Sequence, residues 1–130
     1  MTPEVARSIE ASCHCGTVRI TVAGTPQSVT DCNCSICRRL GALWAYFDPA
    51  DVDMGGAQAT VAYVRHDGPD QGRLGFHHCP TCGCTTHWRN LDPQATRMGV
   101  NARMIDPTVL KGIRVRRLDG ASTWKDLDEA

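Results

Sequence analysis

The alternation of apolar and polar side chains along the chain predicts a protein built mainly from short β-strands. Residues 17–22 alternate cleanly, as Thr-Val-Arg-Ile-Thr-Val, which indicates a strand with one buried face. Residues 43–47 form a denser apolar run and indicate a more buried strand. The same pattern predicts further strands over residues 59–65, 85–88, 97–100 and 113–116.

Signals for helices are few. Residues 35–40 could form one or two helical turns, which Gly41 would end as a C-terminal cap. Residues 106–110 begin with aspartate and then proline, which favours the start of a second short helix. The stretch 67–72, Asp-Gly-Pro-Asp-Gln-Gly, is the clearest predicted loop. We expect a mainly β fold, with no linker long enough to divide residues 1–130 into two domains.

Net charge and the length of apolar runs bear on which partners and which cell compartment to expect. Lys plus Arg and Asp plus Glu number 14 each, and a formal net charge of zero weighs against nucleic acid or an anionic membrane as the main partner. Arg114, Arg116 and Arg117 form a local basic group, for which a solvated strand edge is the simpler interpretation. No apolar run approaches the roughly 20 residues that span a bilayer. Because residues 1–13 also lack the layout of a secretory signal, we expect a cytoplasmic protein.

Cysteine is the residue that points to chemistry. Thiols stay reduced in the cytosol, so clustered cysteines there are more typical of metal sites than of disulfides. All eight cysteines fall into three groups. The groups are Cys13 and Cys15; then Cys32, Cys34 and Cys37; and finally Cys79, Cys82 and Cys84.

The spacing within these groups suits zinc, which takes four tetrahedral ligands with sulfur at about 2.3 Å. A C-x-x-C turn can aim two thiolates at one point, and Pro80 and Gly83 favour such a turn around Cys79 and Cys82. A redox dithiol would instead be expected at a helix start within a βαβ unit, which the pattern does not predict. Eight cysteines allow two closed sites, or one closed site, one open three-cysteine site and a spare thiol.

The order of the groups resembles the glutathione-dependent formaldehyde-activating enzyme family. The resemblance covers about residues 12–124. It implies one zinc domain over residues 1–130, with packed antiparallel sheets in an arrangement described as a tent and few short helices. The resemblance is carried by C-H-C-G at 13–16, C-x-C-x-x-C-R at 32–38, C-P-x-C-G at 79–83, and the closing segments 100–103 and 118–124.

The resemblance also implies two zinc ions and an activity. The implied reaction condenses glutathione with formaldehyde to S-hydroxymethylglutathione, a carbon–sulfur lyase reaction run backwards. At position 84, relatives more often have serine, so Cys84 could be a spare thiol, a fourth ligand to the second zinc or a redox partner. The implied ligands are Cys13, Cys15, Cys79 and Cys82 for a structural zinc, and Cys32, Cys34 and Cys37 for a second, catalytic zinc.

Charge arguments predict what the second zinc would do. Zinc with three thiolates carries a net charge of minus one, which makes it a poor Lewis acid toward a carbonyl but a good holder of a nucleophilic sulfur. We therefore expect a substrate thiol to bind there and to attack a small electrophile such as formaldehyde. Arg38 and Arg39 are candidates to offset the negative charge or to bind a carboxylate of glutathione.

Other assignments stay open. His77 and His78 adjoin Cys79 and could support the metal ligands, while Trp44, Tyr46 and Trp88 are predicted core residues, of which one could line the pocket. The same zinc site could act on another thiol or electrophile. Alternatively, both metals could be structural, in a zinc-stapled binding module without catalysis. The candidate proton donors are Asp31, His14, His77, His78, His87 and Tyr46.

Overall fold

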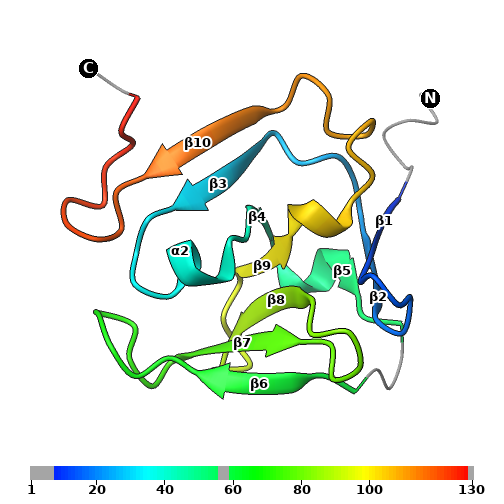
Figure 1. Cartoon of the computed structure of the whole chain (residues 1–130), viewed down its shortest axis with the longest axis horizontal. Coiled ribbons are helices and arrows are strands. Elements are labelled where there is room, and N and C mark those ends of the chain that lie inside the picture. The colour runs from blue at the N-terminus through cyan, green and yellow to red at the C-terminus, as the bar shows by residue number, and fades with distance from the viewer. Residues whose placement is uncertain (1–7, 56–58, 129–130) are drawn as a thin grey trace.

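The computed structural model describes residues 8–55 and 59–128, and over these residues the chain is mainly β (Figure 1). One sheet has three strands in the order β1-β2-β5, and the other has seven in the order β10-β3-β4-β9-β8-β7-β6. The outermost residues of the predicted domain, 1–7 and 129–130, lie outside the described residues. The strands are β1 (Ile9–Ser12), β2 (Arg19–Val22), β3 (Ser28–Cys32), β4 (Trp44–Phe47), β5 (Val52–Asp53), β6 (Val61–Val64), β7 (Leu74–His78), β8 (Thr85–Asn90), β9 (Met98–Asn101) and β10 (Arg114–Leu118).

The predicted strands are confirmed, and each differs from its predicted range by a few residues at the ends. The sequence pattern missed β1, β3, β5 and β7, which are short or interrupted by polar residues and glycine. The pairings within both sheets are antiparallel except that β10 runs parallel to β3. The confirmed strands are β2, β4, β6, β8, β9 and β10.

One of the two predicted helices is present. Helix α2 (Cys37–Leu40) ends at Gly41, which has a φ of 67° and donates its N–H to the Cys37 carbonyl. The predicted helix over residues 106–110 is wrong. There the hydrogen bonds, such as Val109 N–H to the Asp106 carbonyl at 2.9 Å, join residues three apart, so the chain forms tight turns before β10. Two 3₁₀ turns, η1 (Pro49–Asp51) and η2 (Ala102–Met104), complete the helical segments of the described residues.

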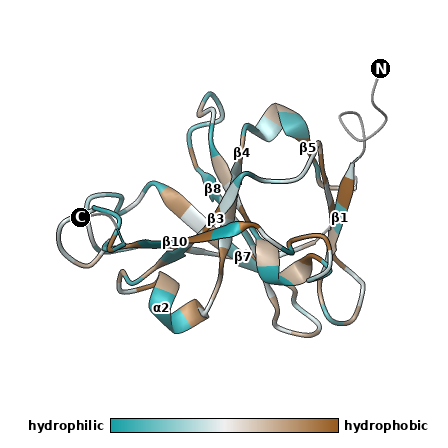
Figure 2. Ribbon diagram, turned by 90° about the horizontal axis from the view of Figure 1, so that it is seen from above, coloured by the Kyte–Doolittle hydropathy of each residue, from teal (hydrophilic) through white to brown (hydrophobic). Residues whose placement is uncertain are grey.

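Two groups of buried side chains form the core. The larger group joins the two sheets, with Ile20 and Val22 from β2 packed together with Met98 and Val100 from β9. The smaller group surrounds Trp44, which is 1% exposed, and includes the three cysteines between β3 and α2. Helix α2 itself carries both hydrophilic and hydrophobic residues, as Figure 2 shows. Among the described residues, no helix is long and apolar enough to cross a membrane.

Two of the three basic residues on β10, Arg114 and Arg117, are solvated as the simpler interpretation predicted, whereas Arg116 is partly buried. Strand β10 is the outermost strand of the larger sheet. Arg114 lies 2.7 Å from Asp126, and Arg117 lies 2.6 Å from Asp128. These ion pairs neutralise much of the local positive charge, so the strand presents no continuous basic surface.

A pair of stacked histidines lies across β7 and β8. The rings of His77 and His87 are parallel to within 16°, with their centroids 4.2 Å apart. The Nδ1 atoms lie 2.8 Å from Thr60 Oγ1 and 2.9 Å from Thr86 Oγ1, respectively. Burial lowers the pKa of His87 to about 3 and also lowers the pKa of His77. Both rings are therefore neutral near pH 7.

This pair predicts a loss of stability in acid. The folded state binds fewer protons at His87 than the unfolded state, whose pKa is near 6.5, so this contribution is present above pH 6.5 and is lost as the pH falls toward 3. We expect the free energy of unfolding to fall by up to about 1.4 kcal/mol per pH unit more in the wild type than in His87→Gln. Chemical denaturation at several pH values measures both slopes. The exposed His66→Gln variant is the control, and a wild-type slope in His87→Gln would contradict the prediction.

Candidate metal centres

Four cysteine sulfurs meet where the two sheets come together. Cys13 and Cys15 follow β1 of the smaller sheet, while Cys79 and Cys82 lie between β7 and β8 of the larger sheet. Their Sγ atoms all lie within 4.8 Å of one another. The Sγ of Cys15 is 3.7 Å from that of Cys13 and 3.6 Å from that of Cys79. Sulfurs around a tetrahedral zinc would be roughly 3.8 Å apart, so this four-cysteine cluster fits such an ion.

Backbone amides face the sulfurs of the four-cysteine cluster. The N–H groups of Thr81 and Cys82 point to Cys79 Sγ at 3.4 and 3.5 Å, as expected of a C-x-x-C turn. Gly83 follows this turn with a φ of 78°. A hydrogen bond from the backbone of Cys15 lowers the pKa of Cys82 to about 6, which favours a thiolate at that sulfur.

Three more cysteine sulfurs gather between β3 and α2. Cys32 ends β3, Cys34 follows in the connecting loop, and Cys37 begins α2. All three side chains are buried, and their Sγ atoms lie within 4.8 Å of one another. Helix α2 and strand β1 lie far apart in both views (Figures 1 and 2), so the three-cysteine cluster is separate from the four-cysteine cluster.

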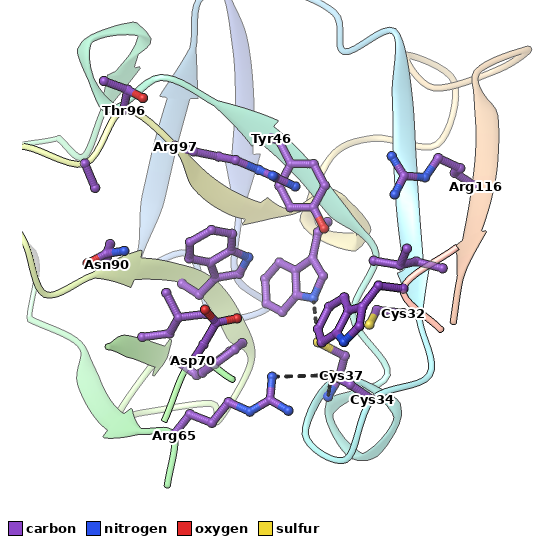
Figure 3. A pocket seen from close by; sticks show the side chains of 17 residues that line it. Cys32, Cys34, Cys37, Tyr46, Arg65, Asp70, Asn90, Thr96, Arg97 and Arg116 are labelled. Carbon is purple, nitrogen blue, oxygen red and sulfur yellow. Dashed lines mark hydrogen bonds between the residues drawn. The ribbon is translucent and has the colours of Figure 1, made fainter. Parts of the chain in front are cut away.

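Two side chains donate hydrogen bonds to the sulfurs of the three-cysteine cluster, in addition to the backbone N–H of Cys37, which points to Cys34 Sγ. The Trp44 indole Nε1–H points to Cys37 Sγ at 3.2 Å, and Arg65 Nη1 lies 3.7 Å from Cys34 Sγ (Figure 3). Hydrogen bonds from Cys32 and Cys37 lower the pKa of Cys34, and the positive charge of Arg65 lowers it further. The same sharing of protons, together with burial, raises the pKa of Cys37. The surroundings therefore stabilise negative charge on the sulfur of Cys34.

Arg65 is held in place by the loop that follows it. Its side chain is only 6% exposed, and its Nε donates to Asp67 Oδ1 at 3.0 Å. The other oxygen of that carboxylate accepts the Ser35 hydroxyl at 2.5 Å, which connects the loop to the segment between Cys34 and Cys37. This role could not be predicted from the sequence, because an arginine at the end of a strand is ordinarily a surface residue.

Cys84 belongs to neither cluster. Its thiol lies 3.6 Å from the Thr85 carbonyl, and its side chain packs against the larger core group beside Cys82. Burial raises the pKa of the Cys84 thiol. Among the described histidines, cysteines and carboxylates, none joins Cys32, Cys34 and Cys37 as a fourth member of their cluster. The three-cysteine cluster therefore has an open side.

A cavity of about 420 Å³ opens beside the three-cysteine cluster (Figure 3). Its walls are largely aromatic: Trp44 packs on Phe76 with ring centroids 5.9 Å apart, and Tyr46 meets Trp88 edge-on at 6.1 Å. Its volume falls within the range of about 300–1,000 Å³ that is usual for small-molecule sites. The charged side chains that line the cavity are Arg65, Asp70, Arg97 and Arg116.

The lining of the cavity includes some of the residues that the sequence suggested as proton donors or as partners of negative charge, and leaves out others. Of the six predicted proton donors, Tyr46 lines the cavity, and burial raises the pKa of its hydroxyl. Arg38 and Arg39 do not line the cavity, and Arg39 instead donates to the Ser35 carbonyl at 2.7 Å. The predicted core residues Trp44 and Trp88 both line the cavity. The candidates that lie outside its lining are Asp31, His14, His77, His78 and His87.

The segment after β10 covers the three-cysteine cluster. The Asn33 amide, between two of the cysteines, donates to Asp119 at 3.1 Å and accepts the Ala121 N–H at 2.9 Å. These bonds bring the backbone of Gly120 close to the sulfurs. A Cβ atom at Gly120 would lie only 2.5 Å from Cys32 Sγ, a distance that real Cβ atoms essentially never show. It would also lie 3.1 Å from Cys34 Cβ. Glycine is therefore required here for space.

Comparison with known proteins identifies relatives of the chain. The family model described as "Glutathione-dependent formaldehyde-activating enzyme" matches residues 8–115. The chain is also similar to a crystal structure of a Rhodobacter sphaeroides protein from a structural genomics programme, with 27% sequence identity and a TM-score of 0.62. That match covers 82% of this chain and 99% of the Rhodobacter chain. The comparison with curated proteins gave no match.

The close approach of Gly120 predicts a selective loss of metal affinity. In Gly120→Ala, the new methyl group must displace Cys32 Sγ, so we expect zinc affinity at the three-cysteine cluster to fall about tenfold or more. The four-cysteine cluster should keep its affinity. Competition titrations with a chromophoric zinc chelator measure both sites. Gly24→Ala is the matched control, because a Cβ there meets nothing within 4 Å, and equal behaviour of the two variants would contradict the prediction.

Proposed function

Because the chain belongs to the family of glutathione-dependent formaldehyde-activating enzymes, we propose that it is a zinc-dependent carbon–sulfur lyase that joins a glutathione-like thiol to formaldehyde or a similar small aldehyde. The observation that carries this proposal is the three-cysteine cluster, which opens onto a cavity of about 420 Å³. A closed four-sulfur cluster elsewhere leaves this one free for chemistry. In the proposed division, Cys13, Cys15, Cys79 and Cys82 hold a structural zinc, and Cys32, Cys34 and Cys37 hold the second zinc.

When bound, the second zinc would lower the pKa of a thiol at its fourth coordination position, so that the thiol loses its proton and the sulfur stays nucleophilic. The chain's own residues make that position usable. Three cysteine thiolates and a substrate thiolate together carry more negative charge than one zinc ion neutralises. Arg65, with a full positive charge, and the Trp44 indole N–H reduce this excess at Cys34 and Cys37.

The proposed step joins sulfur to carbon. A lone pair of the substrate sulfur forms the C–S bond, the π electrons of the aldehyde move to its oxygen, and that oxygen takes up a proton. The product is the S-hydroxymethyl thioether, a hemithioacetal, and the reverse sequence releases the aldehyde and the thiol. The proton that the thiol loses on binding passes to water, and the reacting oxygen takes up one proton from a donor beside it, so that no net proton is consumed.

Tyr46 is the proposed proton donor. Burial and the neighbouring cysteine charges raise the pKa of its hydroxyl, so it keeps its proton near neutral pH. The hydroxyl points toward the side of the cavity on which Cys32 lies (Figure 3). Arg97 stacks on the Tyr46 ring, 3.9 Å from its centroid, which fixes the ring against β4.

The first test asks whether a substrate thiol reaches the metal. We expect zinc K-edge X-ray absorption of the zinc-loaded protein to show more sulfur per zinc after glutathione is added, because glutathione brings a thiolate to the three-cysteine site. S-methylglutathione, which has no thiol, is the control. A sulfur count that glutathione leaves unchanged would favour the alternative of a non-catalytic, zinc-stapled binding module.

The two cysteine clusters should respond differently to substitution. Cys34→Ser is expected to abolish thiol binding while thermal unfolding changes little, since the three-cysteine cluster lies within one sheet and its neighbouring helix. Cys79→Ser should lower the free energy of unfolding strongly, because a structural zinc contributes folding free energy across the two sheets. Calorimetry and zinc content measure both effects. Similar behaviour of the two variants would contradict the proposed division of roles.

Tyr46 also gives a kinetic prediction. In Tyr46→Phe, we expect the rate of thiol–aldehyde exchange at saturation to fall about 10- to 100-fold, because the new alkoxide loses its proton donor. Exchange-transfer NMR between formaldehyde, glutathione and their adduct measures this rate above the uncatalysed background. Tyr63→Phe is the control, since Tyr63 is exposed on β6 and does not line the cavity. An unchanged rate in Tyr46→Phe would remove Tyr46 from the mechanism.

A further inference from the structure

Three charged side chains face the cavity without firm partners. They are Arg97, Arg116 and Asp70. By contrast, three nearby arginines each form a close ion pair with an aspartate. The paired arginines are Arg65 with Asp67 at 3.0 Å, Arg114 with Asp126 at 2.7 Å, and Arg117 with Asp128 at 2.6 Å.

Arg116 projects from β10 into the cavity (Figure 3). Its nearest carboxylate is that of Asp126, 3.8 Å from Nε, and that carboxylate is bound more closely by Arg114. The Arg116 Nε is buried and has no hydrogen-bond partner among the described residues. A buried donor without a partner is costly, which indicates that a ligand supplies the acceptor.

Arg97 and Asp70 complete the set from other walls of the cavity. Over the described ranges, Arg97 stacks on Tyr46 but makes no ion pair, and the Asp70 carboxylate has no hydrogen-bond or ion-pair partner. Asp70 lies in the loop before β7, whereas Arg97 lies just before β9. The cavity therefore offers two positive groups and one negative group on separate elements, in addition to the cysteine cluster.

We propose that Arg97, Arg116 and Asp70 make the site selective for zwitterionic thiols, with the two arginines binding carboxylates and Asp70 binding an ammonium group. This rests on the proposed function, because the sulfur end of the ligand must lie at the three-cysteine cluster. Guanidinium groups match carboxylates with paired, charge-assisted hydrogen bonds. A thiol built from amino acids carries both kinds of charge. A neutral thiol would offer no acceptor to the buried Nε of Arg116.

The test uses a ligand that does not depend on zinc ligation. S-methylglutathione keeps both carboxylates and the ammonium group, and its diester keeps only the ammonium. Calorimetry on the zinc-loaded full chain should show that Arg116→Gln weakens S-methylglutathione binding about tenfold or more, while it leaves binding of the diester unchanged. Arg117→Gln is the matched control on the same strand, because Arg117 pairs with Asp128 and does not line the cavity.

The role of Asp70 is tested through the ammonium group of the ligand. Asp70→Asn should weaken S-methylglutathione but not its N-acetyl derivative, which has no ammonium group. The proposal is overturned if the wild type does not bind S-methylglutathione, if it binds the diester equally well, or if Arg117→Gln weakens binding as much as Arg116→Gln. Failure of the proposed function is separate: it would be seen as 2-mercaptoethanol and glutathione both failing to add sulfur to the zinc.

Discussion

Mutual repulsion of clustered thiolates is the constraint on which both cysteine sites depend. Sulfurs gathered within 4.8 Å, several of them buried, share a site only if donors and positive charge surround them. At the four-cysteine cluster, backbone N–H groups of the C-x-x-C turn face the sulfur of Cys79. At the three-cysteine cluster, Trp44 and Arg65 add side-chain donors. Local backbone geometry supplies these donors at the first cluster, whereas tertiary structure supplies the side-chain donors at the second.

This difference explains how much of the candidate site could be predicted. The C-x-x-C turn is local, so its spacing indicated a metal-binding turn at Cys79 and Cys82, whereas the family resemblance implied that Cys13 and Cys15 join it. Arg65 is 31 residues from Cys34, and Gly120 approaches Cys32 from the far end of the chain. No periodicity connects such positions, because the sheet order β10-β3-β4 that unites them is a long-range property.

The fold was likewise predictable where the signal is local, and not where it depends on contacts between distant parts of the chain. Strand β2 was found from its alternating apolar face, and strand β4 from its dense apolar run. Strand β7 contains a glycine and two histidines, and its place in the sheet comes from its pairing with β8. At residues 106–110, Asp106 makes the cap-like bond to the Thr108 N–H at 2.9 Å. A cap without following helical hydrogen bonds gives only a turn.

The three arginines of the cavity differ in what they are free to bind. Arg65 is buried and already satisfies Cys34 and Asp67, so moving it to a substrate would leave both negative groups uncompensated. Arg97 makes no ion pair among the described residues, and Arg116 has only the longer contact of 3.8 Å to Asp126. Aromatic rings lie beside them in the cavity, and an interaction with a guanidinium group is stronger next to such apolar surface than in bulk water. In the proposed function, Arg65 therefore stabilises the cysteine thiolates, and Arg97 and Arg116 would bind the carboxylates of the substrate thiol.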